Sequence, residues 1–421
     1  MERNLEQIVA MLQEGNTEEG LRLLQEREKH ADHQEMYDLA MIYNELGRAD
    51  KAQPLIEELI SHYPDEGELY TLAAENLIDM DREDEAMEWL LEIKEDDDSF
   101  VRAQMLLADL YQLQGLDEAA ENRLKIALEA APDEPVLLAG LGEYYLERGD
   151  FSKSIPYLKR AEHDGFEYPE GSLELRLAEA YSATGEFESA LRYYEKGLKE
   201  HTDVQALFGY GFTALQLQDY ELAARKLEEL KDLDPEFVSL YPYLIQSLEK
   251  IGNTEQALKV AEDGLAVDEY NDVLYTESGK LYITAGDEQT GEHRLREALS
   301  LNPGNIEASL TLLKLWDTQE DYNSMIDLIT YLREIGEVDA RFDWFYGKAL
   351  WEEDELEEAK EAFDSASSVY NEDRDFLEEY GRLLLELGDR KKALTYLQAA
   401  ARLETPDEDL AMLIADLEEE L

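Results

Sequence analysis

The sequence contains no cysteine, so disulfides, thiol catalysis and cysteine-ligated zinc are excluded. Basic residues are also scarce: 38 lysines and arginines stand against 101 aspartates and glutamates, which gives a formal net charge of −63. A chain with this charge repels phosphate backbones and anionic lipid headgroups. Nucleic acid is therefore not expected as a partner.

Long apolar runs are missing as well. No stretch is long enough to span a bilayer, and the N-terminal sequence MERNLEQ lacks the basic and apolar regions of a secretory signal. We therefore expect a cytoplasmic protein that is not embedded in a membrane. Disorder is not expected despite the acidity, because 44% of the residues are hydrophobic and they recur at helical spacing.

The segment 101–134 contains two amphipathic runs that are separated by Gly115 and ended by Pro132, and this pattern recurs along the chain. Aligning the chain on this segment gives repeats that start at residues 1, 33, 67, 101, 135, 171, 204, 238, 272, 306, 340 and 374. The spacing is close to 34 residues almost throughout. A chain of 421 residues is too long for one compact core, and a stack of repeats can bury these apolar faces.

Small residues and glycines recur at fixed places in the repeat. Small side chains at the eighth position would let paired helices approach closely, and they are Ala40, Ala74, Ala108, Gly142, Ala178, Gly211, Gly279, Gly347 and Gly381. Glycine marks the turn at the fifteenth position, at Gly15, Gly47, Gly115, Gly149, Gly185, Gly252, Gly286 and Gly388. Small residues also recur at the twentieth position, as at Ala52 and Ala86.

With this period and these positions, the chain resembles the tetratricopeptide repeat (TPR) family over essentially its whole length. The resemblance implies an all-α fold, a right-handed α-α superhelix (TPR solenoid) of about twelve helix-turn-helix repeats. We predict an N-terminal array at 1–170 and a C-terminal array at 171–406, because the segment 161–171 is two residues longer than the period. Residues 407–421 carry one further apolar stripe, which predicts a C-terminal capping helix.

Two repeats depart from the pattern. In the first, Ile8 and Arg27 replace small residues, which suits a divergent N-terminal cap. In the tenth, Leu313, Met325 and Leu332 replace all three small residues. We expect these larger side chains to push the two helices apart or to rotate them, and to make the local curvature irregular.

The sequence has no recognisable catalytic or metal-binding motif. A phosphate loop, an HExxH motif and a nucleophile elbow are all missing. The histidines are His30, His33, His62, His163, His201 and His293. Only His30 and His33 are close together, and we interpret them as part of a solvated turn. The acidic run Glu95–Asp98 lacks the glycine and the closing glutamate of an EF-hand loop. We predict a protein that is not an enzyme and needs no cofactor or metal.

The resemblance also implies a concave groove, lined by the first helix of each repeat through positions two, five, nine, twelve and thirteen. Charge is ordered along the ninth position. The acidic row is Glu75, Asp109, Glu143 and Glu179, and the basic row is Lys280, Lys314, Lys348 and Arg382. Large apolar side chains are expected at groove positions at Tyr37, Met105, Phe208, Phe212, Trp344 and Trp351.

Two interpretations of the basic row stay open. It would receive an acidic segment of a partner, or its members would pair with nearby acids, such as Lys280 with Glu277 and Lys348 with Glu352 on the same helix. The acidic row suits a basic segment, or it reflects only the general acidity. The apolar groove residues are either exposed to a ligand or packed between repeats.

We predict a non-catalytic scaffold or adaptor that binds a basic or mixed-charge segment of a partner protein in its groove. Cytoplasmic flanks of membrane proteins are rich in lysine and arginine, so the partner could be such a flank, and the role assembly or biogenesis of a membrane-associated complex. The alternative is a peptide-responsive sensor that controls a response regulator. Such sensors typically add an N-terminal helical bundle, whereas these repeats begin almost at residue 1, which counts against it.

Overall fold

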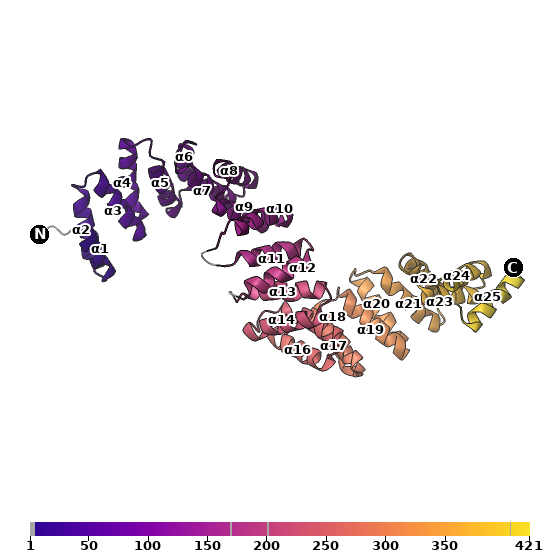
Figure 1. The fold of residues 1–421 in the computed structure, drawn as a ribbon. Coiled ribbons are helices and arrows are strands. Elements are labelled where there is room, and N and C mark those ends of the chain that lie inside the picture. Colours follow the sequence, from indigo (N-terminus) through magenta and orange to yellow (C-terminus); the bar gives the residue numbers. More distant parts are fainter. Residues whose placement is uncertain (1–4, 169–170, 200–201, 405) are drawn as a thin grey trace. The chain divides into compact units, whose positions relative to one another are not determined.

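The computed structural model describes residues 5–168, 171–199, 202–404 and 406–421 (Figure 1). All regular secondary structure in these ranges is α-helical, and the helices follow one another as antiparallel pairs. The chain divides into two compact units, Met1–Thr202 and Asp203–Leu421, which we call unit 1 and unit 2.

Unit 1 consists of six helix pairs. Its helices are α1 (Leu5–Gln13), α2 (Thr17–Glu28), α3 (His33–Glu45), α4 (Ala49–His62), α5 (Gly67–Asp79), α6 (Glu83–Leu91), α7 (Phe100–Leu113), α8 (Asp117–Ala130), α9 (Pro135–Glu147), α10 (Phe151–His163), α11 (Leu173–Ala183) and α12 (Phe187–Gly197). Odd-numbered helices are the first helices of the repeats, and even-numbered helices are the second. Each pair packs against the next along the unit (Figure 1).

Unit 2 consists of six further pairs and a final single helix. Its helices are α13 (Val204–Gln216), α14 (Tyr220–Leu233), α15 (Leu240–Lys250), α16 (Thr254–Val267), α17 (Asp272–Thr284), α18 (Glu288–Leu301), α19 (Ile306–Gln319), α20 (Tyr322–Glu334), α21 (Ala340–Glu352), α22 (Leu356–Tyr370), α23 (Arg374–Glu386), α24 (Arg390–Leu403) and α25 (Glu408–Glu420). The helix α25 packs on α24 through Leu410 and Leu417, both buried, as expected of a capping helix.

The predicted all-α repeat fold is confirmed. Twelve helix pairs occupy the twelve predicted repeats, and each first helix begins within four residues of the predicted start. The first start, at residue 1, lies outside the described residues. So do Pro169 and Glu170 in the predicted segment between the arrays, and His201. The boundary at 170 and 171 therefore stays a prediction, and the compact units meet one repeat later.

The small eighth-position residues allow the two helices of a pair to touch. A Cβ added to Gly142 would lie 2.3 Å from Leu158, and one added to Gly347 would lie 2.7 Å from Phe363. Real Cβ atoms do not approach so closely, so an alanine at either place would require the bulky side chain opposite to shift. In the tenth repeat Leu313 occupies this place and is fully buried, and α19 and α20 pack less extensively along their length than the neighbouring pairs. This looser packing agrees with helices that are pushed apart or rotated, and the irregular curvature stays a prediction.

The turn inside each repeat uses one backbone conformation. The fifteenth residue has a positive φ in all twelve repeats, including the four that lack glycine there: Asp81, Gln218, Glu320 and Asp354. A residue with a side chain pays a steric cost in this left-handed region. The turn geometry is therefore required by the fold rather than permitted by glycine.

We expect Gln218→Gly to raise the free energy of unfolding by about 0.5–1 kcal/mol, because it relieves the strained φ of 62° at an exposed site. Gly115→Ala is the matched control. Nothing lies within 4 Å of the Cβ it would add, so it tests the backbone alone and should cost about 1 kcal/mol. Urea unfolding followed by circular dichroism measures both. Destabilisation by Gln218→Gly would contradict the strain argument.

Candidate functional site

Within each unit the first helices form the inner face. Successive first helices contact each other directly, for example α5 with α7 in unit 1 and α15 with α17 in unit 2, in addition to their contacts with second helices. We call the side of each unit on which these first helices lie the inner face. The predicted groove positions belong to these helices, and their role in binding stays a prediction.

A pocket on the inner face of unit 2 contains predicted groove positions. It has a volume of about 780 Å³ and is formed by α15, α17 and the start of α19. All five predicted groove positions of one repeat line it, namely Ser239, Pro242, Gln246, Glu249 and Lys250. In unit 1 a pocket of about 430 Å³ lies between α1 and α3 and includes the ninth-position residues Val9 and Met41.

Two lysines of the basic row are held by carboxylates of their own unit. Lys280 lies in the pocket and bonds Glu277 at 2.9 Å and Glu307 at 2.8 Å. Lys348 bonds Asp317 at 2.8 Å and Glu379 at 3.3 Å. Burial opposes the charge on each lysine, but the hydrogen bonds outweigh it and raise both pKa values. The pairing of Lys280 with Glu277 is confirmed.

The predicted pairing of Lys348 with Glu352 is wrong. The two residues share a helix at favourable spacing, but acids on the neighbouring helices α19 and α23 reach the ammonium instead. Arg382 bonds Glu378 at 2.7 Å on its own helix. Lys314 differs from the other three, because it is exposed and has no ion pair or hydrogen bond within the described part of the chain.

Most carboxylates of the acidic row also have an ion pair or a hydrogen-bond donor within the protein. Arg102 pairs with Glu75. Arg176 bonds Glu143 at 3.2 Å and approaches Glu179 at 3.7 Å, and the hydroxyl of Tyr168 donates to Glu143 at 2.6 Å. The pairs of Arg102 with Glu75 and of Arg176 with Glu143 link neighbouring repeats on the inner face of unit 1. They also reduce the negative charge that this row presents to a partner.

Asp109 is the exception in the acidic row. Its carboxylate has no ion pair or hydrogen bond within the residues the structure describes, and neither do those of Asp79 on α5 and Glu147 on α9. Although Asp109 is exposed, the protein atoms around it displace enough water to raise its pKa, and the charge of Glu147 adds to the shift. Three consecutive repeats thus carry uncompensated acids at groove positions.

The predicted apolar groove residues are partly buried. Phe208 and Phe212 pack against Tyr243, with ring centroids 5.6 and 5.5 Å apart. Trp344 and Trp351 donate their indole N–H groups to Glu379 at 2.7 Å and Glu386 at 2.9 Å.

On the inner face of unit 1, the hydroxyl of Tyr37 donates to Glu68 at 2.9 Å, and Met105 is partly buried. Like Phe208 and the tryptophans, Tyr37 contacts a neighbouring repeat and keeps part of its surface exposed.

Other residues considered in the sequence, some of the histidines and part of the acidic run, make contacts within the protein. His33 stacks on His62 with centroids 4.4 Å apart and contacts the hydroxyl of Tyr63 at 2.9 Å, so its neighbour in space is not His30. In the acidic run 95–98, Asp97 accepts hydrogen bonds from the backbone N–H of Gly67 and of Ser99. In the described ranges, three or more histidine and carboxylate side chains do not gather in a metal-binding group.

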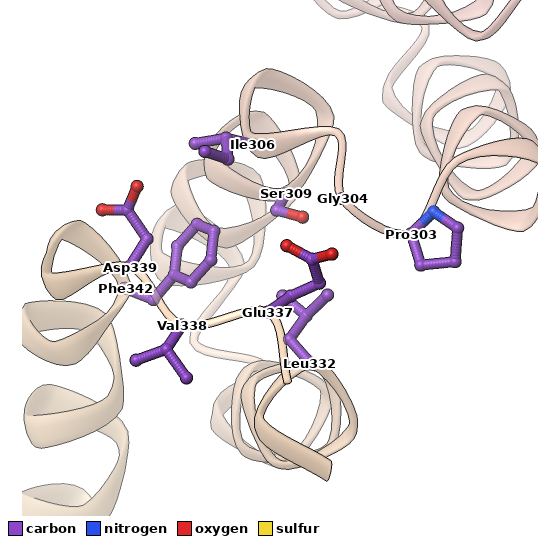
Figure 2. A pocket seen from close by; sticks show the side chains of 9 residues that line it. All are labelled: Pro303, Gly304, Ile306, Ser309, Leu332, Glu337, Val338, Asp339 and Phe342. Atoms are coloured by element: carbon purple, nitrogen blue, oxygen red, sulfur yellow. The ribbon is translucent and has the colours of Figure 1, made fainter. Parts of the chain in front are cut away.

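A small cavity of about 20 Å³ lies where α19 begins beside the segment that joins α20 to α21. Figure 2 shows the hydroxyl of Ser309 and the carboxylate of Glu337 on its wall. The Ser309 hydroxyl is buried without a hydrogen-bond partner. The volume suits a single water molecule, so this cavity is not a site for a partner.

Sequence reasoning missed Glu249, Lys250 and Glu147. All three occupy the twelfth or thirteenth position, and only the ninth position was compared from repeat to repeat. The same comparison at positions twelve and thirteen would have found all three as charges without an oppositely charged residue three or four places away on the same helix.

The helices form an array of pairs with an inner face, the described residues contain no strand, and the repeat has a period of 34 residues. Together these features define the class of tetratricopeptide repeat proteins. Residues 112–165 match the family described as "YpiA-like, tetratricopeptide repeats", and residues 341–407 match "YpiA-like, C-terminal tetratricopeptide repeats". Residues 43–110 and 175–236 match two general tetratricopeptide repeat families.

The chain belongs to this family, because it is 40% identical over 416 residues to the TPR repeat-containing protein YpiA of Bacillus subtilis (strain 168), covering 99% of this chain and 98% of YpiA. It is 23% identical to the protein CTR9 homolog of Arabidopsis thaliana, over 73% of this chain and 25% of that protein. Among solved structures it is similar to the APC/C hetero-tetramer Cut9-Hcn1, with 13% identity, a TM-score of 0.43 and coverage of 97% and 95%.

Proteins of this family generally mediate protein–protein interaction, and membership favours a non-catalytic role. No helix in the described ranges combines the length and the apolar character needed to cross a bilayer.

We expect Lys348→Ala to lower the free energy of unfolding by about 1–2 kcal/mol, because it leaves Asp317 and the largely buried Glu379 without their cation. Lys314→Ala, at the equivalent place one repeat earlier, should change it by less than about 0.5 kcal/mol. Urea unfolding of both variants tests this. Equal effects would mean that the Lys348 pairs do not stabilise the fold.

A raised pKa means that the folded state holds the proton of Asp109 more tightly than the unfolded state does. Its contribution to stability therefore falls as the pH rises through the pKa. Asp109→Asn should make the protein slightly more stable at pH 7, with a gain that shrinks as the pH falls toward about 4. Unfolding at several pH values measures this against Glu118→Gln on the outer helix α8. A variant less stable than the wild type at pH 7 would refute the argument.

Proposed function

We propose that this protein is a non-catalytic scaffold whose inner groove holds a basic or mixed-charge segment of a partner protein. The observation that carries the proposal is the charge that remains after internal pairing. Asp79, Asp109 and Glu147 are uncompensated on the inner face of unit 1, whereas most cations of the basic row are paired.

Electrostatics supports a basic rather than an acidic segment in unit 1. An unpaired carboxylate beside a like charge gains more from an incoming ammonium or guanidinium than a carboxylate that already has a donor. The exposed surfaces of residues such as Leu113 and Val136, which occupy groove positions on α7 and α9, would be covered by the same segment.

Lysine-rich and arginine-rich flanks of membrane proteins on the cytoplasmic side fit this requirement. We therefore infer a cytoplasmic role in the assembly or biogenesis of a membrane-associated complex. Control of a response regulator by a bound peptide is the alternative from the sequence, and the partner recovered by the experiment below distinguishes the two roles.

The test is affinity capture with the full chain and with the double variant Asp109→Asn, Glu147→Gln. Partners held by the groove of unit 1 should be recovered about fivefold less by the variant, because two charge contacts are lost. Quantitative mass spectrometry of the captured proteins measures the ratio.

The matched control is Glu118→Gln, Glu129→Gln. It removes the same charge from exposed positions on α8, a second helix outside the groove. Recovery of the same proteins in the same amounts by the wild type and the groove variant would refute the proposal. An equal loss in both variants would mean that net charge alone, and not the groove, retains the partners.

A further inference from the structure

The pocket formed by α15, α17 and α19 contains two charged groups without a partner. In the described part of the chain, the carboxylate of Glu249 and the ammonium of Lys250 make no ion pair and no side-chain hydrogen bond. Both line the pocket, and Lys250 is exposed whereas Glu249 is partly buried. The pocket therefore offers one acceptor and one donor side by side.

The surroundings of Glu249 favour an incoming cation. Burial raises the pKa of this carboxylate, and the charge of Glu277 raises it further, while Lys280 and Lys250 act in the opposite direction without bonding it. A partly desolvated carboxylate that has no hydrogen-bond donor is costly in the free protein. A cation that bonded Glu249 would remove this cost.

Lys280 does not fill that role, although it is near. Its ammonium is fixed between Glu277 and Glu307, which both line the same pocket. The three hydrogens of an ammonium are largely used by these two carboxylates. Glu249 therefore remains available to a ligand even though a lysine of the protein stands beside it.

Part of the pocket wall is apolar and includes an aromatic ring. Val238, Pro242 and Tyr243 line the pocket, and the ring of Tyr243 packs against Phe208 and Phe212. The long aliphatic stems of arginine and lysine pack well on such surfaces while their charged ends reach a carboxylate.

We propose that this pocket recognises two neighbouring side chains of opposite charge in an extended partner segment: an arginine or lysine bound by Glu249, and an aspartate or glutamate bound by Lys250. The apolar wall and Tyr243 receive the stem of the basic side chain. This inference rests on the proposed function, since it names the chemistry by which unit 2 holds the segment.

The first experiment selects ligands from a displayed library of random short peptides with the full chain. Peptides that contain a basic residue beside an acidic one should be enriched by the wild type. Glu249→Gln should lose the preference for the basic residue, and Lys250→Gln the preference for the acidic residue. Glu255→Gln, an exposed change on the second helix α16, is the control and should keep both preferences.

The second experiment measures the coupling directly by fluorescence anisotropy, with one selected peptide and the same peptide carrying glutamine in place of its basic residue. Glu249→Gln should weaken the parent peptide about tenfold, as expected for one charge-assisted hydrogen bond. It should not weaken the glutamine peptide further, because the interaction is then already absent. Circular dichroism verifies that each variant is folded.

Equal binding of the parent peptide by the wild type and Glu249→Gln would overturn this inference. The proposed function would survive that result if Asp109→Asn, Glu147→Gln still reduced partner recovery. A wild-type protein that enriches no peptide at all would count against both the inference and the groove as a binding site.

Discussion

A pair of amphipathic helices cannot bury its own apolar faces, so each repeat depends on close approach within the pair and on the repeats beside it. Gly142 under Leu158 and Gly347 under Phe363 show how this approach is achieved, with a bulky residue seated on a residue that has no side chain. The same packing brings successive first helices together. The inner face, and with it the candidate binding surface, is therefore a consequence of how the core is filled.

Ion pairing determines which charges on the inner face remain available to a partner. The chain has few cations, and on the inner face most of them are used to join neighbouring repeats, as Arg102 does with Glu75 and Lys348 with Asp317. Exposed pairs such as Arg102 with Glu75 contribute little stability singly, but all these pairs decide which charges remain for a partner. What remains is chiefly carboxylate in unit 1 and, in unit 2, Lys314 together with Glu249 and Lys250 of the pocket.

The sequence predicted the repeats well because their rules are local. The period, the turn at position fifteen and the prolines that follow second helices, such as Pro64 and Pro303, are each set within one repeat. The side-chain pairs were less predictable, because Lys280 and Glu307 are 27 residues apart and Lys348 and Asp317 are 31 apart. Such partners depend on the stacking of successive repeats, which spacing along one helix does not reveal.

The ion pairs across the inner face of unit 2 are unevenly distributed. Lys280 fastens α17 to α19, and Lys348 fastens α21 to both α19 and α23. Between α15 and α17, by contrast, Glu249 faces the like charge of Glu277. A ligand cation that bonded Glu249 would place between these two like charges the positive charge that Lys280 and Lys348 supply further along the inner face.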